Sequence, residues 1–110
     1  MDNTKKHLQD ILTAIEEIDS FFGAEHKLFN EFAENLCLRR AVERNIEVIG
    51  EAMNRILKSN ADVQISNARK IVDARNYIIH GYDSLSVDLL WSIVINHLPK
   101  LKVEVTELLK

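Results

Sequence analysis

The chain has 110 residues, of which 46% are hydrophobic and 28% are charged, and its formal net charge is −3. This length fits one domain with a single hydrophobic core, so we expect residues 1–110 to form one domain. One proline and three glycines are too few for the many turns of an all-β fold. The negative net charge argues against a surface that binds nucleic acid over its whole area, so any such contact must use a local basic surface.

Composition also indicates the cellular compartment in which the protein acts. No apolar run approaches the roughly 18 residues that cross a membrane, and residues 1–7 lack the apolar segment of a secretory signal. The single cysteine, Cys37, excludes an internal disulfide, and we expect it to be buried on a helix as a small apolar side chain. Because His7, His26 and His97 have no second ligand at metal spacing, we predict no metal site and no cofactor. These features predict a soluble cytoplasmic protein with no membrane partner.

Apolar residues recur at helical spacing in the first half of the chain. A first helix is predicted over residues 8–22 and should end at Gly23, because glycine tolerates positive φ. A second and much longer helix is predicted over residues 30–58. It contains Gly50, which costs about 1 kcal/mol in a helix relative to alanine and is therefore expected to mark a close helix crossing.

The second half predicts two further helical segments. One runs from about residue 66 to His80, and another begins after Ser86, whose side chain suits an N-cap. Pro99 is expected to break or kink this last segment, since proline lacks the amide hydrogen. The sequence therefore predicts an all-α, up-and-down bundle of four to five helices.

Four apolar residues lie off the main apolar stripes of these helices, namely Val72, Ile79, Leu89 and Ile93. Two explanations are open. The helices either have wide buried faces, or they carry a surface through which two copies of the chain associate.

Residues 75–82, RNYIIHGY, combine a cation, a carboxamide, an imidazole and a phenol. Asn76 and His80 are four apart and share one helix face, whereas Arg75 points about 100° away and reaches that face through its long side chain. Histidine titrates near pH 6.5, about the range that acid–base catalysis needs, and arginine binds phosphate bidentately. The cluster thus fits metal-free cleavage of RNA, with Tyr82 near the cleft. Because one copy supplies one such histidine, we expect a composite site across a dimer axis.

The same cluster also has a purely structural explanation. His80 would then lie at a helix C-terminus, where the helix dipole favours a cation, and Asn76 would be a surface amide. Arg75 would be solvated or paired with Asp73 or Asp83. The residues by themselves leave this alternative open.

A basic patch on the long helix contains Arg39, Arg40 and Arg44. Arg39 has an acidic residue four positions later, Glu43, which predicts an ion pair on the helix surface. Arg40 and Arg44 lack such an obvious partner, so they are the candidates for binding RNA phosphates. A solvated polar face is the alternative.

Residues 75–82 match the R-x4-6-H motif of HEPN domains, in the R-x4-H-x-Y form of HepT-like toxins. RAVERNIEVIGEA at residues 40–52 resembles the long-helix signature of that group. VDLLW at residues 87–91, followed by LPKL at 98–101, resembles its C-terminal region, and residues 8–18 resemble its first helix. The resemblance therefore spans nearly the full chain.

This resemblance implies an all-helical homodimer with metal-independent endoribonuclease activity. It makes Arg75 and His80 the catalytic pair and Asn76 a residue that shapes the site. Such toxins belong to type VII-like toxin–antitoxin systems and are usually encoded beside a nucleotidyltransferase-fold antitoxin of the MntA type. That antitoxin can transfer AMP from ATP to the motif tyrosine, here Tyr82, where bulk and negative charge would exclude RNA.

The chain departs from the HepT-like pattern at two places. Residues 65–67 read Ile-Ser-Asn where relatives often show a Pro-Trp pair, and Ala74 replaces a larger apolar side chain. Neither change touches the motif. The same fold also serves as a non-catalytic subunit that binds nucleotide or substrate for a nucleotidyltransferase, which is the alternative function.

Overall fold

The computed structural model describes residues 3–23, 27–59, 63–79 and 86–110. These residues form α1 (Thr4–Phe21), α2 (Phe29–Glu34), α3 (Leu36–Lys58), α4 (Ala68–Ile79), α5 (Val87–Ser92), a π-helical turn η1 (Ile93–His97) and α6 (Leu98–Leu108). Within these ranges there is no strand, and the predicted all-α bundle is confirmed. None of the described helices is long and apolar enough to cross a membrane.

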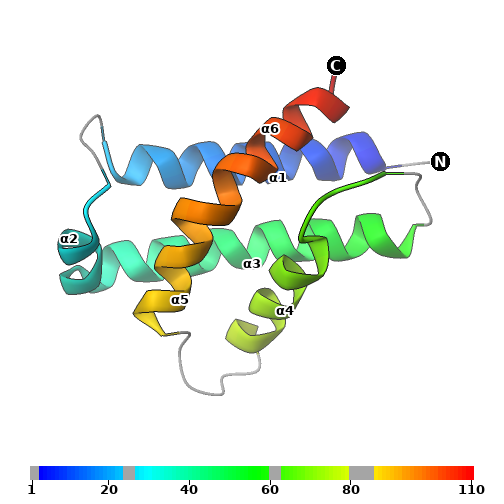
Figure 1. The fold of residues 1–110 in the computed structure, drawn as a ribbon. Helices are drawn as coiled ribbons and strands as arrows, with labels where there is room; N and C mark the ends of the chain where they lie inside the picture. The colour runs from blue at the N-terminus through cyan, green and yellow to red at the C-terminus, as the bar shows by residue number, and fades with distance from the viewer. Residues whose placement is uncertain (1–2, 24–26, 60–62, 80–85) are drawn as a thin grey trace.

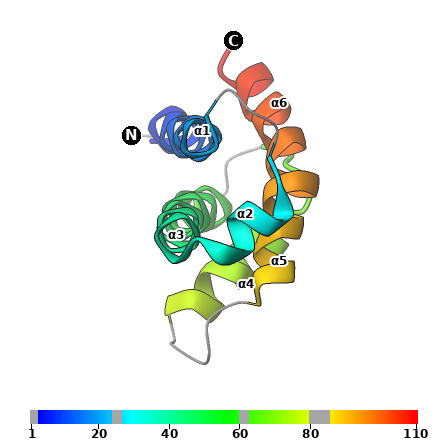
Figure 2. The same cartoon turned by 90° about the vertical axis from the view of Figure 1, so that its left-hand side faces the viewer.

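The long helix α3 is the centre of the molecule. It lies antiparallel to α1 on one side and packs against α4 on the other (Figure 1). In the end-on view, α1, α3 and α4 follow one another in a layer, and the rod formed by α5, η1 and α6 runs along one side of it (Figure 2). The apolar stripes of all these helices meet in one buried core.

The contact between α1 and α3 contains a buried polar residue, Asn45. Its Nδ2 donates to the carbonyl oxygen of Ala14 at 3.1 Å and to Oε1 of Glu17 at 2.9 Å. Because a buried amide without partners is costly, these two bonds fix the register of α3 along α1.

The crossing of α3 and α4 is centred on Gly50. A Cβ atom at this position would lie 2.9 Å from Cγ of Arg75 and 3.1 Å from the carbonyl oxygen of Ile71, and closer still to Cβ of Arg75. The prediction that Gly50 marks a close helix crossing is therefore confirmed. Gly23, with φ at 71°, follows the end of α1 as predicted.

The prediction of one continuous helix over residues 30–58 is wrong. The chain leaves helical geometry at Asn35, where φ is −105° and ψ is 97°. The Asn35 side chain accepts a hydrogen bond from the Leu38 amide at 3.0 Å and so caps a new helix, α3. Cys37, in the first turn of α3, is exposed, so its predicted burial is also wrong.

An aromatic cluster explains why α2 turns away from α3. The ring of Trp91 lies 5.4 Å from that of Phe32, 5.6 Å from Phe29 and 6.3 Å from Phe22, between centroids. Phe29 and Phe32 come from α2, so the short helix must lie across the start of the α5 rod to bring them there. These edge-to-face and tilted contacts are favourable geometries for aromatic pairs.

Regular α-helical hydrogen bonding is interrupted shortly before Pro99, by the π-helical turn η1. Helical backbone angles continue through Ile93 and Leu98 on either side of this turn, and Pro99 lies in the first turn of α6. A π-helical turn replaces bonds between residues four apart by bonds between residues five apart. The helical path thereby continues past Pro99, which has no amide hydrogen to donate.

The four apolar residues off the main stripes divide into two pairs. Val72 and Ile93 are buried, which supports a wide buried face at those positions. Ile79 and Leu89 are each 47% exposed, so they remain available for association with a second surface.

Candidate active site around Arg75

The motif segment begins on the last turns of α4. Arg75 and Asn76 lie on this helix, which ends at Ile79. His80 and Tyr82 lie outside the described residues, so their places in the site stay predictions.

The guanidinium of Arg75 is held between α4 and α3. Its Nη2 donates a short, charge-assisted hydrogen bond to Oε2 of Glu51, and its Nη1 donates to Oδ1 of Asn76 at 2.8 Å. The side chain is only 22% exposed, and its buried Nε has no hydrogen-bond partner among the described residues. Arg75 is thus a mostly buried cation whose two terminal nitrogens are each bonded to a neighbouring side chain.

The observed partner of Arg75 differs from those that the structural explanation named. Instead of Asp73, the next acidic residue on its own helix, it pairs with Glu51 of α3, 24 positions away. Asp83 lies outside the described residues. The contact with Asn76 shows that the long Arg75 side chain reaches its neighbour's polar group.

Glu51 bridges two arginines. Its Oε1 accepts hydrogen bonds from Nε and Nη2 of Arg55 at 3.2 and 3.1 Å, and its Oε2 accepts the bond from Arg75. The hydrogen bond from Arg55 lowers the pKa of Glu51 most; partial burial opposes this, and the charge and hydrogen bond of Arg75 lower the pKa further. Glu51 is therefore ionised at neutral pH.

The position of Arg75 depends on the helix crossing. The missing side chain at Gly50 allows Cβ and Cγ of Arg75 to lie against the backbone of α3. Glu51 is the next residue along α3, so the same crossing brings the carboxylate to the guanidinium. Gly50 indicated a helix crossing in the sequence, but it did not indicate which residue of another helix Glu51 would meet.

A cavity of about 420 Å³ adjoins Glu51. It lies between α1 and α3, and Ile79, the last residue of α4, also lines it. Its lining includes three cations, each of which is paired with a carboxylate: Lys6 with Asp10 at 3.0 Å, Arg44 with Glu47 at 3.1 Å and Arg55 with Glu51 at 3.1 Å.

The two predicted RNA-binding arginines are exposed, but both have partners. Arg44 contacts Glu47 at 3.1 Å and Arg40 contacts Glu43 at 3.7 Å, so the prediction that they lack acidic partners is wrong. The spacing is three residues instead of four, which places each pair on adjacent turns of α3. The predicted pair of Arg39 with Glu43 does not form; Arg39 donates to a backbone carbonyl of α2.

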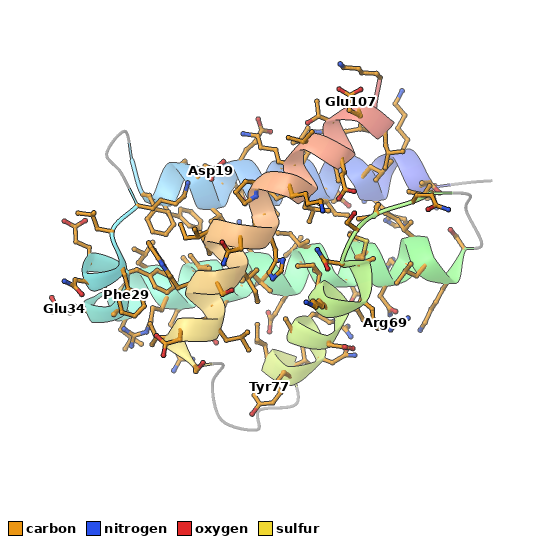
Figure 3. All side chains as sticks on the ribbon, in the orientation of Figure 1. Asp19, Phe29, Glu34, Arg69, Tyr77 and Glu107 are labelled. Atoms are coloured by element: carbon orange, nitrogen blue, oxygen red, sulfur yellow. The ribbon has the colours of Figure 1, made fainter. Side chains whose placement is uncertain are left out.

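The part of the chain that the structure describes contains no group of three or more metal-ligating side chains. A second cavity, of about 460 Å³, lies between α4 and the α5–η1 rod and is lined in part by Tyr77, Leu89 and His97. Tyr77 projects outward from the end of α4 (Figure 3).

A family model described as "Ribonuclease HepT-like" matches residues 11–108. The chain belongs to the HepT-like ribonuclease family. This confirms the family inferred from the motif and from the long-helix signature.

Curated relatives of this HepT-like chain carry names of the same kind. It is 35% identical over 105 residues to a Methanocaldococcus jannaschii protein named "Putative RNase", with 94% of each chain covered. It is 32% identical over 107 residues to "Probable ribonuclease HepT" of Thermococcus cleftensis, with 96% of each covered. No solved structure matches.

Within this HepT-like fold, the structure brings together two of the predicted site residues, Arg75 and Asn76. It adds one that the sequence pattern did not indicate, Glu51, which lies inside the long-helix signature. Arg44 lies at the neighbouring cavity, and Arg40 is exposed on the same helix, one turn nearer its N-terminus.

Proposed function

We propose that this protein is the toxin of a type VII-like toxin–antitoxin pair, and that it is an endoribonuclease acting in the cytoplasm as a homodimer. The observation that carries the proposal is the arrangement of Arg75. A permanent cation, whose side chain is 22% exposed, is held by Glu51 and Asn76 at the start of the R-x4-H-x-Y motif. Such a preorganised cation suits a transition state whose charge develops on a phosphate.

The proposed reaction is a transesterification without a metal ion. The 2′-oxygen of the RNA attacks the adjacent phosphorus, forming a new oxygen–phosphorus bond, and the bond from phosphorus to the 5′-oxygen breaks. His80 takes the 2′-hydroxyl proton, and His80 of the partner subunit protonates the leaving 5′-oxygen. Arg75 stabilises the negative charge of the phosphorane-like transition state. The products carry a 2′,3′-cyclic phosphate and a 5′-hydroxyl.

Arg40 and Arg44 extend the proposed RNA contact along α3. Both arginine side chains are exposed, at 66% and 72%, whereas the side chains of their partners Glu43 and Glu47 are only 11% and 23% exposed. These exposed cations can contact RNA phosphates while they remain near their carboxylates, and binding should weaken as salt concentration rises.

The test of the catalytic proposal is cleavage of total RNA by purified protein in EDTA, resolved on a denaturing gel. Wild type should cleave and His80→Ala should not, because His80 supplies both proton transfers. His97→Ala is the matched control and should cleave as wild type, since His97 lines the other cavity. End-group analysis should find 2′,3′-cyclic phosphate.

Other outcomes of this experiment would refute the proposal. If no variant cleaves, although intact mass shows unmodified protein, the non-catalytic nucleotide-binding subunit becomes the better function. If His80→Ala cleaves as fast as wild type, the reaction does not depend on the motif.

We further propose that a nucleotidyltransferase-fold antitoxin of the MntA type neutralises the protein by transferring AMP to Tyr82. The β- and γ-phosphates of ATP leave as pyrophosphate, and a bond forms between the tyrosine oxygen and the α-phosphorus. The added phosphate would place a negative charge near Arg75 and exclude RNA.

The modification is tested by incubating the toxin with ATP and the antitoxin, followed by intact mass measurement. Tyr82→Phe should gain no AMP. Tyr77→Phe is the matched control, because Tyr77 is the other tyrosine of the motif segment and is exposed on α4. This variant should gain AMP as wild type does. An undiminished mass gain in Tyr82→Phe would exclude Tyr82 as the acceptor.

A further inference from the structure

We infer that Glu51 is a positioning residue, which fixes the guanidinium of Arg75 in the orientation that binds the scissile phosphate. The inference rests on the proposed function, because it assigns Glu51 a role only through a phosphate-binding Arg75. Glu51 itself touches no substrate in this assignment.

The first support is that Arg75 is constrained from several sides. Glu51 holds Nη2, Asn76 holds Nη1, and the backbone of α3 at Gly50 lies against the first carbons of the side chain. A free arginine side chain samples many rotamers, and ordering it at the moment of reaction costs conformational entropy. A side chain already held by two hydrogen bonds avoids most of that cost.

The second support is what these contacts leave free. Each Nη atom carries two hydrogens, and each Nη atom bonds to one acceptor among the described residues. Among the described residues, one N–H on Nη1 and one on Nη2 therefore have no acceptor, and the side chain that carries them is 22% exposed. Two parallel N–H groups are the donors of a bidentate contact to phosphate.

The third support is the division of the Glu51 carboxylate between two cations. Arg55 bonds only to Oε1, and Arg75 bonds to Oε2. Arg55 lies one turn further along the same helix, so its two hydrogen bonds orient the carboxylate from within α3. The oxygen that faces α4 is thereby directed at Arg75.

An ordinary surface ion pair is the competing explanation of the same contacts. Exposed pairs contribute little to stability, and their loss changes no catalytic constant selectively. The two explanations therefore predict different values of kcat, the rate constant for cleavage, for a Glu51 variant that folds as wild type does.

The experiment compares Glu51→Gln with Asp10→Asn in cleavage of a short RNA. The control is closely matched, because Asp10 and Glu51 are each 42% exposed, each forms an ion pair four residues away on its own helix, and both line the same cavity. Glu51→Gln should lower kcat by about tenfold or more, the scale that displacement of a catalytic group produces, and should change KM by less than about threefold. Asp10→Asn should stay within about twofold of wild type in both constants. Glu51→Asp keeps the charge and should recover part of kcat.

A second arm repeats Glu51→Gln in an Arg75→Lys background, with enzyme concentration raised until residual cleavage by Arg75→Lys is measured. If Glu51 acts through the Arg75 guanidinium, this further change should have little effect, because there is no fork left to orient. An equal drop in both backgrounds would overturn the inference, as would an unchanged kcat for Glu51→Gln.

The arms separate the two proposals. Cleavage by wild type and by Glu51→Gln alike, with loss in His80→Ala, would refute the role of Glu51 and leave the proposed function intact. Absence of cleavage by wild type would refute both. Thermal midpoints of all variants, measured alongside, should show folded protein.

Discussion

At position 50 the absence of a side chain decides where Arg75 lies. Gly50 lies in close contact with α4, and the first carbons of Arg75 occupy the space that a Cβ would need. One glycine thus connects the packing of the bundle with the geometry of the candidate site.

Gly50→Ala should lower stability, although alanine is the better helix former by about 1 kcal/mol. The added carbon overlaps Arg75 and approaches the carbonyl oxygen of Ile71, so α4 must move, and overpacking of this kind typically costs about 1–3 kcal/mol. We expect a lower denaturation midpoint and reduced RNA cleavage. A midpoint above that of wild type would mean that propensity outweighs the contact and that the crossing is looser than described.

The site residues could be predicted from sequence only where their interactions are local. Arg75 and Asn76 are adjacent, and their contact follows from side-chain length. Glu51 is 24 positions from Arg75, and nothing in the local pattern indicates which acidic residue an arginine will meet across a helix crossing.

At the scale of helices, the boundary between α2 and α3 shows how a side chain overrides periodicity. Apolar spacing continues smoothly through residues 30–58, but Asn35 adopts extended geometry and caps α3 through the Leu38 amide. The aromatic contacts of Phe29 and Phe32 with Trp91 stabilise the alternative path of α2.

Asn35→Ala should reduce the free energy of unfolding by about 1 kcal/mol, the usual effect of removing an N-cap side chain. Chemical denaturation with circular dichroism measures it. Asn30→Ala is the matched control, because this exposed residue of α2 supplies no cap, and it should be neutral or slightly stabilising. Equal losses in both variants would argue that Asn35 stabilises the protein by something other than capping.

At the scale of the whole molecule, the exposed apolar residues near the end of α4 and the start of α5 are candidates for the proposed dimer contact. Ile79 and Leu89 are each 47% exposed. Tyr77 is two positions before Ile79 on α4, and it lines the second cavity together with Leu89. Ile79 directly precedes His80, so association through this surface would bring two copies of the motif together.

Ile79→Asp should convert the dimer into a monomer and abolish RNA cleavage, because a charge would be buried without a partner at the contact. Sedimentation and cleavage assays measure the two effects. Val103→Asp introduces the same charge at an exposed apolar residue of α6 and should leave both unchanged. Dissociation by Val103→Asp alone would place the contact on α6 and argue against a composite site at α4.

Helical periodicity by itself determined the all-α class and the place of Arg75 and Asn76 on a helix, because both depend on residues a few positions apart. The R-x4-H-x-Y motif, together with a resemblance over nearly the full chain, determined the family. Gly50 was also identified as the site of a helix crossing, since a glycine inside a helix destabilises that helix unless a close contact requires it. Only the tertiary structure decided which helix crosses there, that Glu51 meets Arg75, and where the long helical pattern breaks. Those outcomes depend on contacts between distant segments, whose free energies a local pattern does not contain.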